Sequence, residues 1–122
     1  MKEKKWGRIV NIISYAWKSG GKTSGTAYSS SKGGLVGLTF AMAKELAEFG
    51  VTVNGIAPAY VLTDMVLKQL SEKQRLEQQE AIPVKKFAKP EEVAHAVRFL
   101  SDPLAAFITG EIIDMNGGFQ FD

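Results

Sequence analysis

The chain has 122 residues, 45% of them hydrophobic and 23% charged, which is typical of one globular domain and excludes disordered and collagen-like classes. Its 15 basic and 13 acidic residues leave a net charge of +2, so we expect no nucleic-acid partner. With no cysteine, one histidine and no long apolar run, the sequence indicates a cytoplasmic protein without disulfides, a metal site or a membrane partner.

The first predicted elements are a strand, a loop and a long helix. Residues 8–14 are β-branched and almost continuously apolar, as in a parallel strand buried on both faces. Residues 15–26 are rich in Gly, Ser and Lys and indicate a loop. Residues 27–49 carry apolar side chains at every third or fourth position, which predicts a helix that Gly50 ends.

Three glycines lie inside this predicted helix, at positions 33, 34 and 37. Each lowers helix propensity by up to about 1 kcal/mol relative to alanine. We therefore expect another backbone, a cofactor or a helix to approach closely at these positions.

The second half of the chain continues the alternation of strands and helices. Residues 51–57 form a second predicted strand, stopped by Pro58, so that strand, helix and strand make a βαβ unit with parallel strands. One or two short helices are expected within residues 64–80, where a polar sequence has a few apolar anchors, and we expect this segment to be mobile.

A further helix and strand are predicted near the end of the chain. The helix begins at Pro90 and stops before Pro103. Its buried side is expected to consist of residues 93, 97 and 100, with 94, 96 and 99 around them. We expect His95, on another face, to be solvated. Residues 111–115 make the third strand and 116–118 a turn.

Three residues have the chemistry of a proton-transfer site. Tyr28 and Lys32 are spaced i and i+4, so on a helix they share one face, where an ammonium favours the ionised form of a neighbouring phenol. Ser14 closes the first strand, and a hydroxyl there can supply a second hydrogen bond to the oxygen of a substrate. The spacing therefore predicts Tyr28 as a general acid or base.

Other readings of the same residues remain open. Residues 19–23 resemble the tail of a phosphate-binding P-loop, although that motif needs a glycine where Ala16 stands. Ser29 and Lys32 match the serine-lysine pattern of acyl-transfer enzymes, without the motifs that accompany it. No Gly-x-Gly-x-x-Gly turn occurs in the sequence.

Three segments together resemble the short-chain dehydrogenase/reductase family. They are residues 7–14 (GRIVNIIS), 27–35 (AYSSSKGGL) and 53–58 (VNGIAP), in the family's order and spacing. The resemblance extends over the whole chain and, in residues 90–94 and the tail, is strongest to 3-oxoacyl-carrier-protein reductases. It implies an α/β fold: the C-terminal half of a Rossmann-type parallel sheet of about three strands, with a long catalytic helix, a short-helix lid and a further helix.

The resemblance also implies the roles of individual residues. Ser14 corresponds to the substrate-orienting serine, Tyr28 to the acid/base, and Lys32 to the lysine that assists the tyrosine. The cofactor, NADP or NAD, is expected to contact Tyr28, Lys32, Pro58, Ala59, Val61 and Thr63. Two positions depart from the family pattern: Ala59 stands in place of the usual glycine, and Ile13 in place of a second serine.

Residues 1–122 correspond to a single partial domain, because the resemblance puts the dinucleotide-binding half outside this sequence. We therefore expect an oxidoreductase that reduces a small-molecule carbonyl or oxidises an alcohol, with the isolated chain inactive. The alternative is a non-enzymatic association module that pairs with itself or with a complementary N-terminal half. The family's subunit contacts, on the long helix and the last strand, make a homo-oligomer the expected state.

Overall fold

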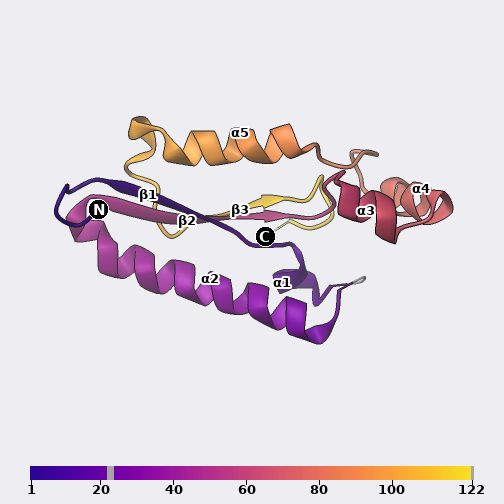
Figure 1. Cartoon of the computed structure of the whole chain (residues 1–122), viewed down its shortest axis with the longest axis horizontal. Helices are drawn as coiled ribbons and strands as arrows, with labels where there is room; N and C mark the ends of the chain where they lie inside the picture. The colour runs from indigo at the N-terminus through magenta and orange to yellow at the C-terminus, as the bar shows by residue number, and fades with distance from the viewer. Residues whose placement is uncertain (22–23, 122) are drawn as a thin grey trace.

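The protein is a three-layer α/β structure. The computed structural model describes residues 1–21 and 24–121. Three strands, β1 (Gly7–Ile12), β2 (Val51–Pro58) and β3 (Ile112–Met115), form one parallel sheet in the order β1-β2-β3. The long helix α2 (Thr26–Leu46) covers one face of the sheet and α5 (Pro90–Ser101) covers the other (Figure 1). The predicted parallel α/β fold is confirmed.

The central strand β2 is buried along its whole length, because it has a strand on each side and a helix on each face. A cluster of Ile13, Val36 and Ala57 fills the space between the sheet and α2. Ile13 is 2% exposed, so the position where the family carries a second serine points into the core. In the described sheet, β1 and β3 are the two edge strands.

The segment between β1 and α2 differs from the prediction. Residues 15–26 were expected to be a loop, but α1 (Ala16–Ser19) forms one helical turn there. The turn is stabilised by hydrogen bonds from the Trp17 N–H to the Ser14 carbonyl and from the Ser19 N–H to the Tyr15 carbonyl. A four-residue helix has too few periodic positions for a hydrophobic pattern to reveal it.

The helix α2 starts and ends close to the predicted positions. A 3₁₀ turn, η1 (Ala47–Phe49), extends it to Gly50, whose φ of 67° is the left-handed conformation that ends helices. The expected close approach at its three internal glycines is not found among the described residues. A Cβ added at any of them would meet nothing within 4 Å.

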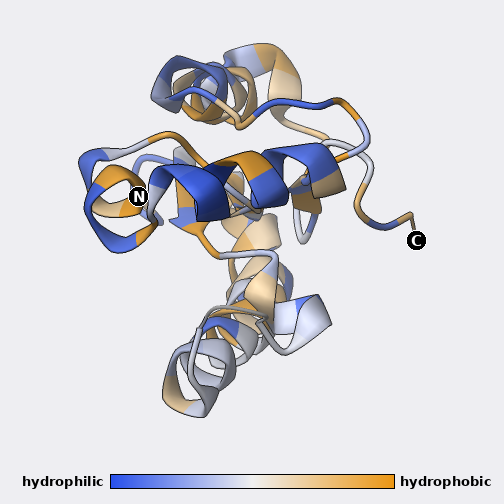
Figure 2. Ribbon diagram, turned by 90° about the vertical axis from the view of Figure 1, so that its right-hand side faces the viewer, coloured by the Kyte–Doolittle hydropathy of each residue, from blue (hydrophilic) through white to orange (hydrophobic). Residues whose placement is uncertain are grey.

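Two short helices, α3 (Asp64–Gln69) and α4 (Glu72–Ala81), lie beyond the carboxyl ends of the strands, at the right of Figure 1. Side chains cap both: Thr63 accepts from the Val66 N–H, and Ser71 forms a capping box with Gln74. Figure 2, which views the molecule from this end, shows the nearest helix as mostly hydrophilic, with hydrophobic residues between the polar ones. One or two short helices were predicted here, and two are found.

The helix α5 buries a narrower face than the sequence predicts. Its buried or half-buried side includes Val93, Val97 and Leu100, and His95 is exposed as expected. However, Phe99 is 51% exposed, so its predicted place beside the buried residues is wrong. A 3₁₀ turn, η2 (Pro103–Ala105), follows α5, and none of the described helices is long and apolar enough to span a membrane.

Candidate functional site

The candidate site is a cavity of about 730 Å³ at the carboxyl ends of β1 and β2. Ser14, just after β1, and Tyr28, in the first turn of α2, both line it. Parallel sheets characteristically bind ligands at this end, where the connecting loops meet. The structure thus places a serine that follows a strand and a tyrosine from the next long helix at the same cavity.

Two hydrogen bonds, one from each half of α2, hold this helix against β1. The Lys32 ammonium donates to the Ile12 carbonyl at 2.8 Å, and the Asn11 amide donates to Thr39 Oγ1 at 2.9 Å. Thr39 is fully buried, so this second bond forms inside the interface between strand and helix. Together they fix the helix that carries Tyr28 relative to the strand that ends at Ser14.

Tyr28 and Lys32 lie next to each other as their spacing predicts. The Lys32 Nζ is 5.7 Å from the centre of the Tyr28 ring, within the range of a cation-π contact. Lys32 does not line the cavity, whereas Tyr28 is 44% exposed at its wall. The ammonium therefore lies beside the phenol without occupying the space open to a ligand.

The Ser14 hydroxyl accepts one hydrogen bond from the backbone. Its Oγ accepts a hydrogen bond from the Ala16 N–H at 3.2 Å. A hydroxyl has one proton to donate and two lone pairs, so this bond leaves the proton free for another acceptor. Ser14 is thus suited to donate to an oxygen of a ligand in the cavity.

The predicted cofactor loop is only partly at the cavity. Of its four residues, Ala59 lines the cavity, and it is not among the non-glycine residues with a positive φ, so its backbone accommodates a Cβ. Pro58 ends β2, Val61 forms a bridge with Ala88, and Thr63 caps α3. These three contribute to the structure that shapes the cavity.

Aromatic side chains form a wall of the cavity that the sequence analysis missed. The Tyr15 ring stacks on Phe119 with centroids 5.9 Å apart, and Tyr60 lies 6.3 Å from Phe119. Apolar lid residues, including Met65 and Leu70, line the same cavity. Each aromatic residue follows the carboxyl end of a strand, which is the sequence signal that could have identified them.

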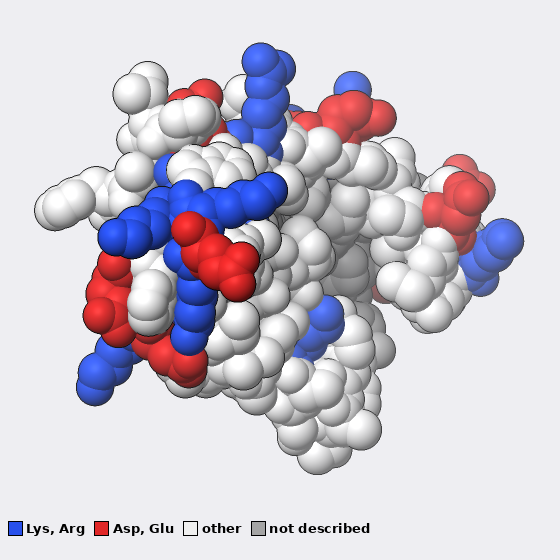
Figure 3. Space-filling view, turned by 60° about the vertical axis from the view of Figure 1, so that its left-hand side comes forward, with Lys and Arg blue, Asp and Glu red and all other residues white. Residues whose placement is uncertain are grey.

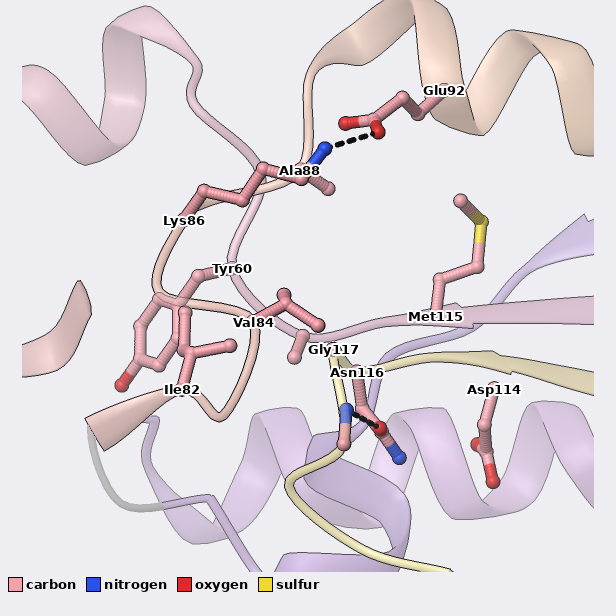
Figure 4. A pocket seen from close by; sticks show the side chains of 12 residues that line it. Tyr60, Ile82, Val84, Lys86, Ala88, Glu92, Asp114, Met115, Asn116 and Gly117 are labelled. Carbon is pink, nitrogen blue, oxygen red and sulfur yellow. Dashed lines mark hydrogen bonds and ion pairs between the residues drawn. The ribbon is translucent and has the colours of Figure 1, made fainter. Parts of the chain in front are cut away.

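A second, smaller cavity of about 310 Å³ lies on the α5 side (Figure 4). At its rim the Lys86 ammonium donates to Glu92 at 2.8 Å. That bond, followed by the Lys89 backbone N–H, holds the pKa of the Glu92 carboxyl below its usual value. Neither Ser14 nor Tyr28 lines this cavity.

The alternative chemistries have less support. The Ser29 hydroxyl donates to the Gly20 carbonyl, while the Lys32 ammonium donates to the Ile12 carbonyl, so both partners of the serine-lysine pattern are engaged elsewhere. In the P-loop-like segment, residues 22 and 23 lie outside the described residues. Within the described residues, no group of three or more His, Asp or Glu side chains could hold a metal ion.

Comparison with known proteins identifies the family. A family model described as enoyl-(acyl carrier protein) reductase matches residues 1–120. The chain belongs to the short-chain dehydrogenase/reductase family. A 3-oxoacyl-(acyl-carrier-protein) reductase of Aquifex aeolicus is 47% identical over 118 residues, which are 97% of this chain and 47% of the relative. Nodulation protein G of Azospirillum brasilense is 41% identical over 99% of this chain and 48% of the relative.

Solved structures of the short-chain dehydrogenase/reductase family superpose closely on this chain. A 3-oxoacyl-(acyl-carrier protein) reductase of Brucella melitensis matches with a TM-score of 0.93 and 30% identity, over 99% of this chain and 45% of that one. A Beutenbergia cavernae protein, assigned as an NAD(P)-dependent gluconate 5-dehydrogenase with bound NADP, matches with a TM-score of 0.90 and 35% identity. The match covers 98% of this chain and 48% of that one. The chain therefore spans about half the length of these relatives.

Proposed function

We propose that the protein supplies the proton-transfer site of an NAD(P)-dependent short-chain oxidoreductase, with Tyr28 as the acid/base. The observation that carries the proposal is that Ser14 and Tyr28 line one cavity, with the Lys32 ammonium beside the Tyr28 ring. Ser14 follows β1, whereas Tyr28 and Lys32 are on α2, so two elements must pack together to form the site. An i, i+4 pair on a helix surface would not by itself bring a serine to the same cavity.

The residues at the cavity fit the nicotinamide end of a dinucleotide. Ala59 lines the cavity. The Lys32 ammonium, bonded to the Ile12 carbonyl, is a cationic donor that suits a ribose hydroxyl. Bound NAD(P)H would supply the hydride for carbonyl reduction. The 122 residues carry no Gly-x-Gly-x-x-Gly turn, and we propose that the diphosphate is held by the dinucleotide-binding half that the family resemblance puts outside this sequence.

The proposed proton transfer follows from the hydrogen-bonding capacity of each group. The Ser14 hydroxyl donates to the substrate carbonyl oxygen, because that oxygen can only accept and the bond from the Ala16 N–H leaves the hydroxyl proton unused. Tyr28 donates its proton to the same oxygen as the carbonyl carbon gains a hydride, and the product is an alcohol. The nearby Lys32 ammonium stabilises the phenolate that remains. Oxidation of the alcohol reverses these steps.

The cavity wall favours a substrate with an apolar chain. Aromatic and apolar side chains line the cavity together with Ser14 and Tyr28. The matched relatives from Aquifex aeolicus and Brucella melitensis act on 3-oxoacyl groups of a carrier protein, as their names state. We propose a 3-oxoacyl thioester as the substrate class and NADP or NAD as the cofactor.

A chimera tests this function. The 122 residues replace the matching part of the Aquifex aeolicus relative, and NADPH oxidation is followed with a 3-oxoacyl thioester. Tyr28→Phe is expected to lower kcat about 100-fold or more, because general acid catalysis typically contributes that much. Ser30→Ala is the control: it removes an exposed hydroxyl two residues further along the same helix, which does not line the cavity, and should retain most activity. A chimera that binds NADPH without turnover, or a fully active Tyr28→Phe variant, would refute the assignment.

A second candidate function is association, with residues 1–122 acting as one partial domain that pairs with a second copy or a complementary half. The edge of β1 is open, and Ile12 at its end is 46% exposed. On α2, Leu38 and Phe40 are 50% and 47% exposed on a stretch without charge between Lys32 and Lys44. Figure 3 shows this largely uncharged surface below the charged N-terminal region.

Sedimentation of the purified chain distinguishes the two functions. An associated species that does not bind NADPH would support the association module. A stable monomer that titrates with NADPH would contradict it and support the enzyme.

A further inference from the structure

The acceptor bond to Ser14 depends on a helix that cannot be stable alone. The Ala16 N–H that binds Ser14 Oγ belongs to α1, which is a single turn of four residues. Isolated helices of this length do not persist in water, so tertiary contacts must hold α1 in place. The backbone beside Ser14 is held by hydrogen bonds from the Ile13 N–H to the Ile56 carbonyl and from the Tyr15 N–H to the Pro58 carbonyl. The contacts of α1 therefore bear on the direction of the Ser14 hydroxyl, through the Ala16 N–H, and not on the place of its backbone.

An ion pair between α1 and β3 provides such a contact. The Lys18 ammonium donates to Asp114 Oδ2 at 2.5 Å, and the two side chains are only 15% and 17% exposed. Asp114 is on the last strand, 96 residues further along the chain. Figure 4 shows Asp114 and Met115 on opposite sides of β3, with Asp114 turned away from the α5 side. Little solvent screens the pair, so its orientation is well defined.

Tyr15, the residue just before α1, contacts the same C-terminal segment. Its ring stacks on Phe119, and its hydroxyl donates to the Gln120 side chain at 3.2 Å. Within α1, the Lys18 ammonium lies 5.4 Å from the centre of the Trp17 ring, and Trp17 packs against the core cluster. The side chains after β3 therefore support α1 together with α2 and the core.

We propose that Lys18 and Asp114 are positioning residues that hold α1 so that the Ser14 hydroxyl directs its proton into the cavity. Neither residue touches the reacting atoms; the pair acts through the Ala16 N–H. The proposal rests on the proposed function, because it concerns the orientation of the substrate-binding serine.

Hydrogen exchange of the 122-residue chain tests the structural step without turnover. Lys18→Met keeps an apolar stem and removes the charge, so the Ala16 amide should exchange about tenfold faster or more, while the Val53 amide in the central strand keeps its protection. Lys18→Arg, which keeps the cation, should restore slow exchange at Ala16. Lys2→Met is the matched control, since it removes an exposed ion pair with Glu45.

Kinetics of the chimera test the functional step. Lys18→Met is expected to lower kcat about tenfold or more with the KM for NADPH unchanged, because donation from one well-placed hydroxyl acts mainly in the transition state. Unchanged exchange at Ala16, equal loss of protection at Val53, no restoration by arginine, or an unchanged kcat would each overturn the inference. A chimera inactive in every variant would count against the proposed function, while exchange at Ala16 would still decide the role of the pair.

Discussion

Gly55 lies at the centre of β2, and replacing it with alanine should destabilise the fold. It pairs with Asn11 of β1 on one side and Ile112 of β3 on the other. A Cβ at this position would overlap Ile13 Cδ1 and lie 2.7 Å from Ile112 Cδ1. Because Ile13 is 2% exposed, its side chain has little room to move away.

The expected cost of Gly55→Ala is a difference of two terms. Overpacking a close-packed core costs about 1 to 3 kcal/mol. Alanine has less conformational entropy than glycine in the unfolded chain, which offsets about 0.4 to 1 kcal/mol of this cost. We therefore expect the free energy of unfolding to fall by about 1 to 2 kcal/mol.

Ile13→Val gives a sharper test of this reasoning, because it removes the methyl group that the new Cβ overlaps. Alone it should cost about 1 kcal/mol. With Gly55→Ala it should cost at least about 0.5 kcal/mol less than the sum of the two single changes. Relief should be incomplete, since the methyl of Ile112 still lies close to the new Cβ.

Urea unfolding followed by far-ultraviolet circular dichroism and tryptophan fluorescence measures these energies, and Trp17 reports on the Ile13 cluster. Gly34→Ala is the matched control: it is exposed on α2 with nothing within 4 Å, and should stabilise the protein by up to about 1 kcal/mol. A Gly55→Ala variant as stable as the parent, or strictly additive energies in the double variant, would refute the packing argument.

Two further predictions concern polar groups. Folding lowers the pKa of Glu92, chiefly through the Lys86 hydrogen bond. The ionised Glu92 therefore adds its full stabilisation above the usual glutamate pKa, and this stabilisation is lost as the pH falls through the lowered pKa. Glu92→Gln should flatten that part of a plot of melting temperature against pH. The side chain of Asn54 is fully buried; its amide nitrogen donates to the Ile108 carbonyl, and its amide oxygen accepts from the Glu111 N–H. Asn54→Ala should lower the free energy of unfolding in urea by about 2 to 4 kcal/mol. An unchanged unfolding midpoint would contradict this expectation.

Much of the fold could be predicted because it depends on local pattern. The three strands are β-branched apolar runs, and α2 has the 3.6-residue period and a glycine at its end, so each was found within a few residues of its observed bounds. The single turn of α1 was missed, because four residues present no period. Phe99 was placed on the buried side of α5 because sequence shows which residues share a face but not how wide a face the sheet covers.

The candidate site was predictable only in part. The i, i+4 spacing placed Lys32 beside Tyr28, and both are found in contact. The role of Thr63 as a helix cap could have been read from its position before α3, yet the resemblance assigned it to the cofactor. The aromatic wall brings Tyr15 against Phe119, more than a hundred residues later, and no local pattern predicts that pair.

The sequence by itself determined the family, the order of strands and helices, and the residue types that transfer a proton, because motifs and periodicity are local properties of the chain. Only the tertiary structure decided that the Ser14 and Tyr28 hydroxyls share a cavity, that the Ala16 N–H leaves the serine free to donate, and that Lys18 is paired with Asp114. These contacts join segments far apart in the chain. Their geometry follows from how the parallel sheet brings its carboxyl ends together, which spacing along the sequence does not specify.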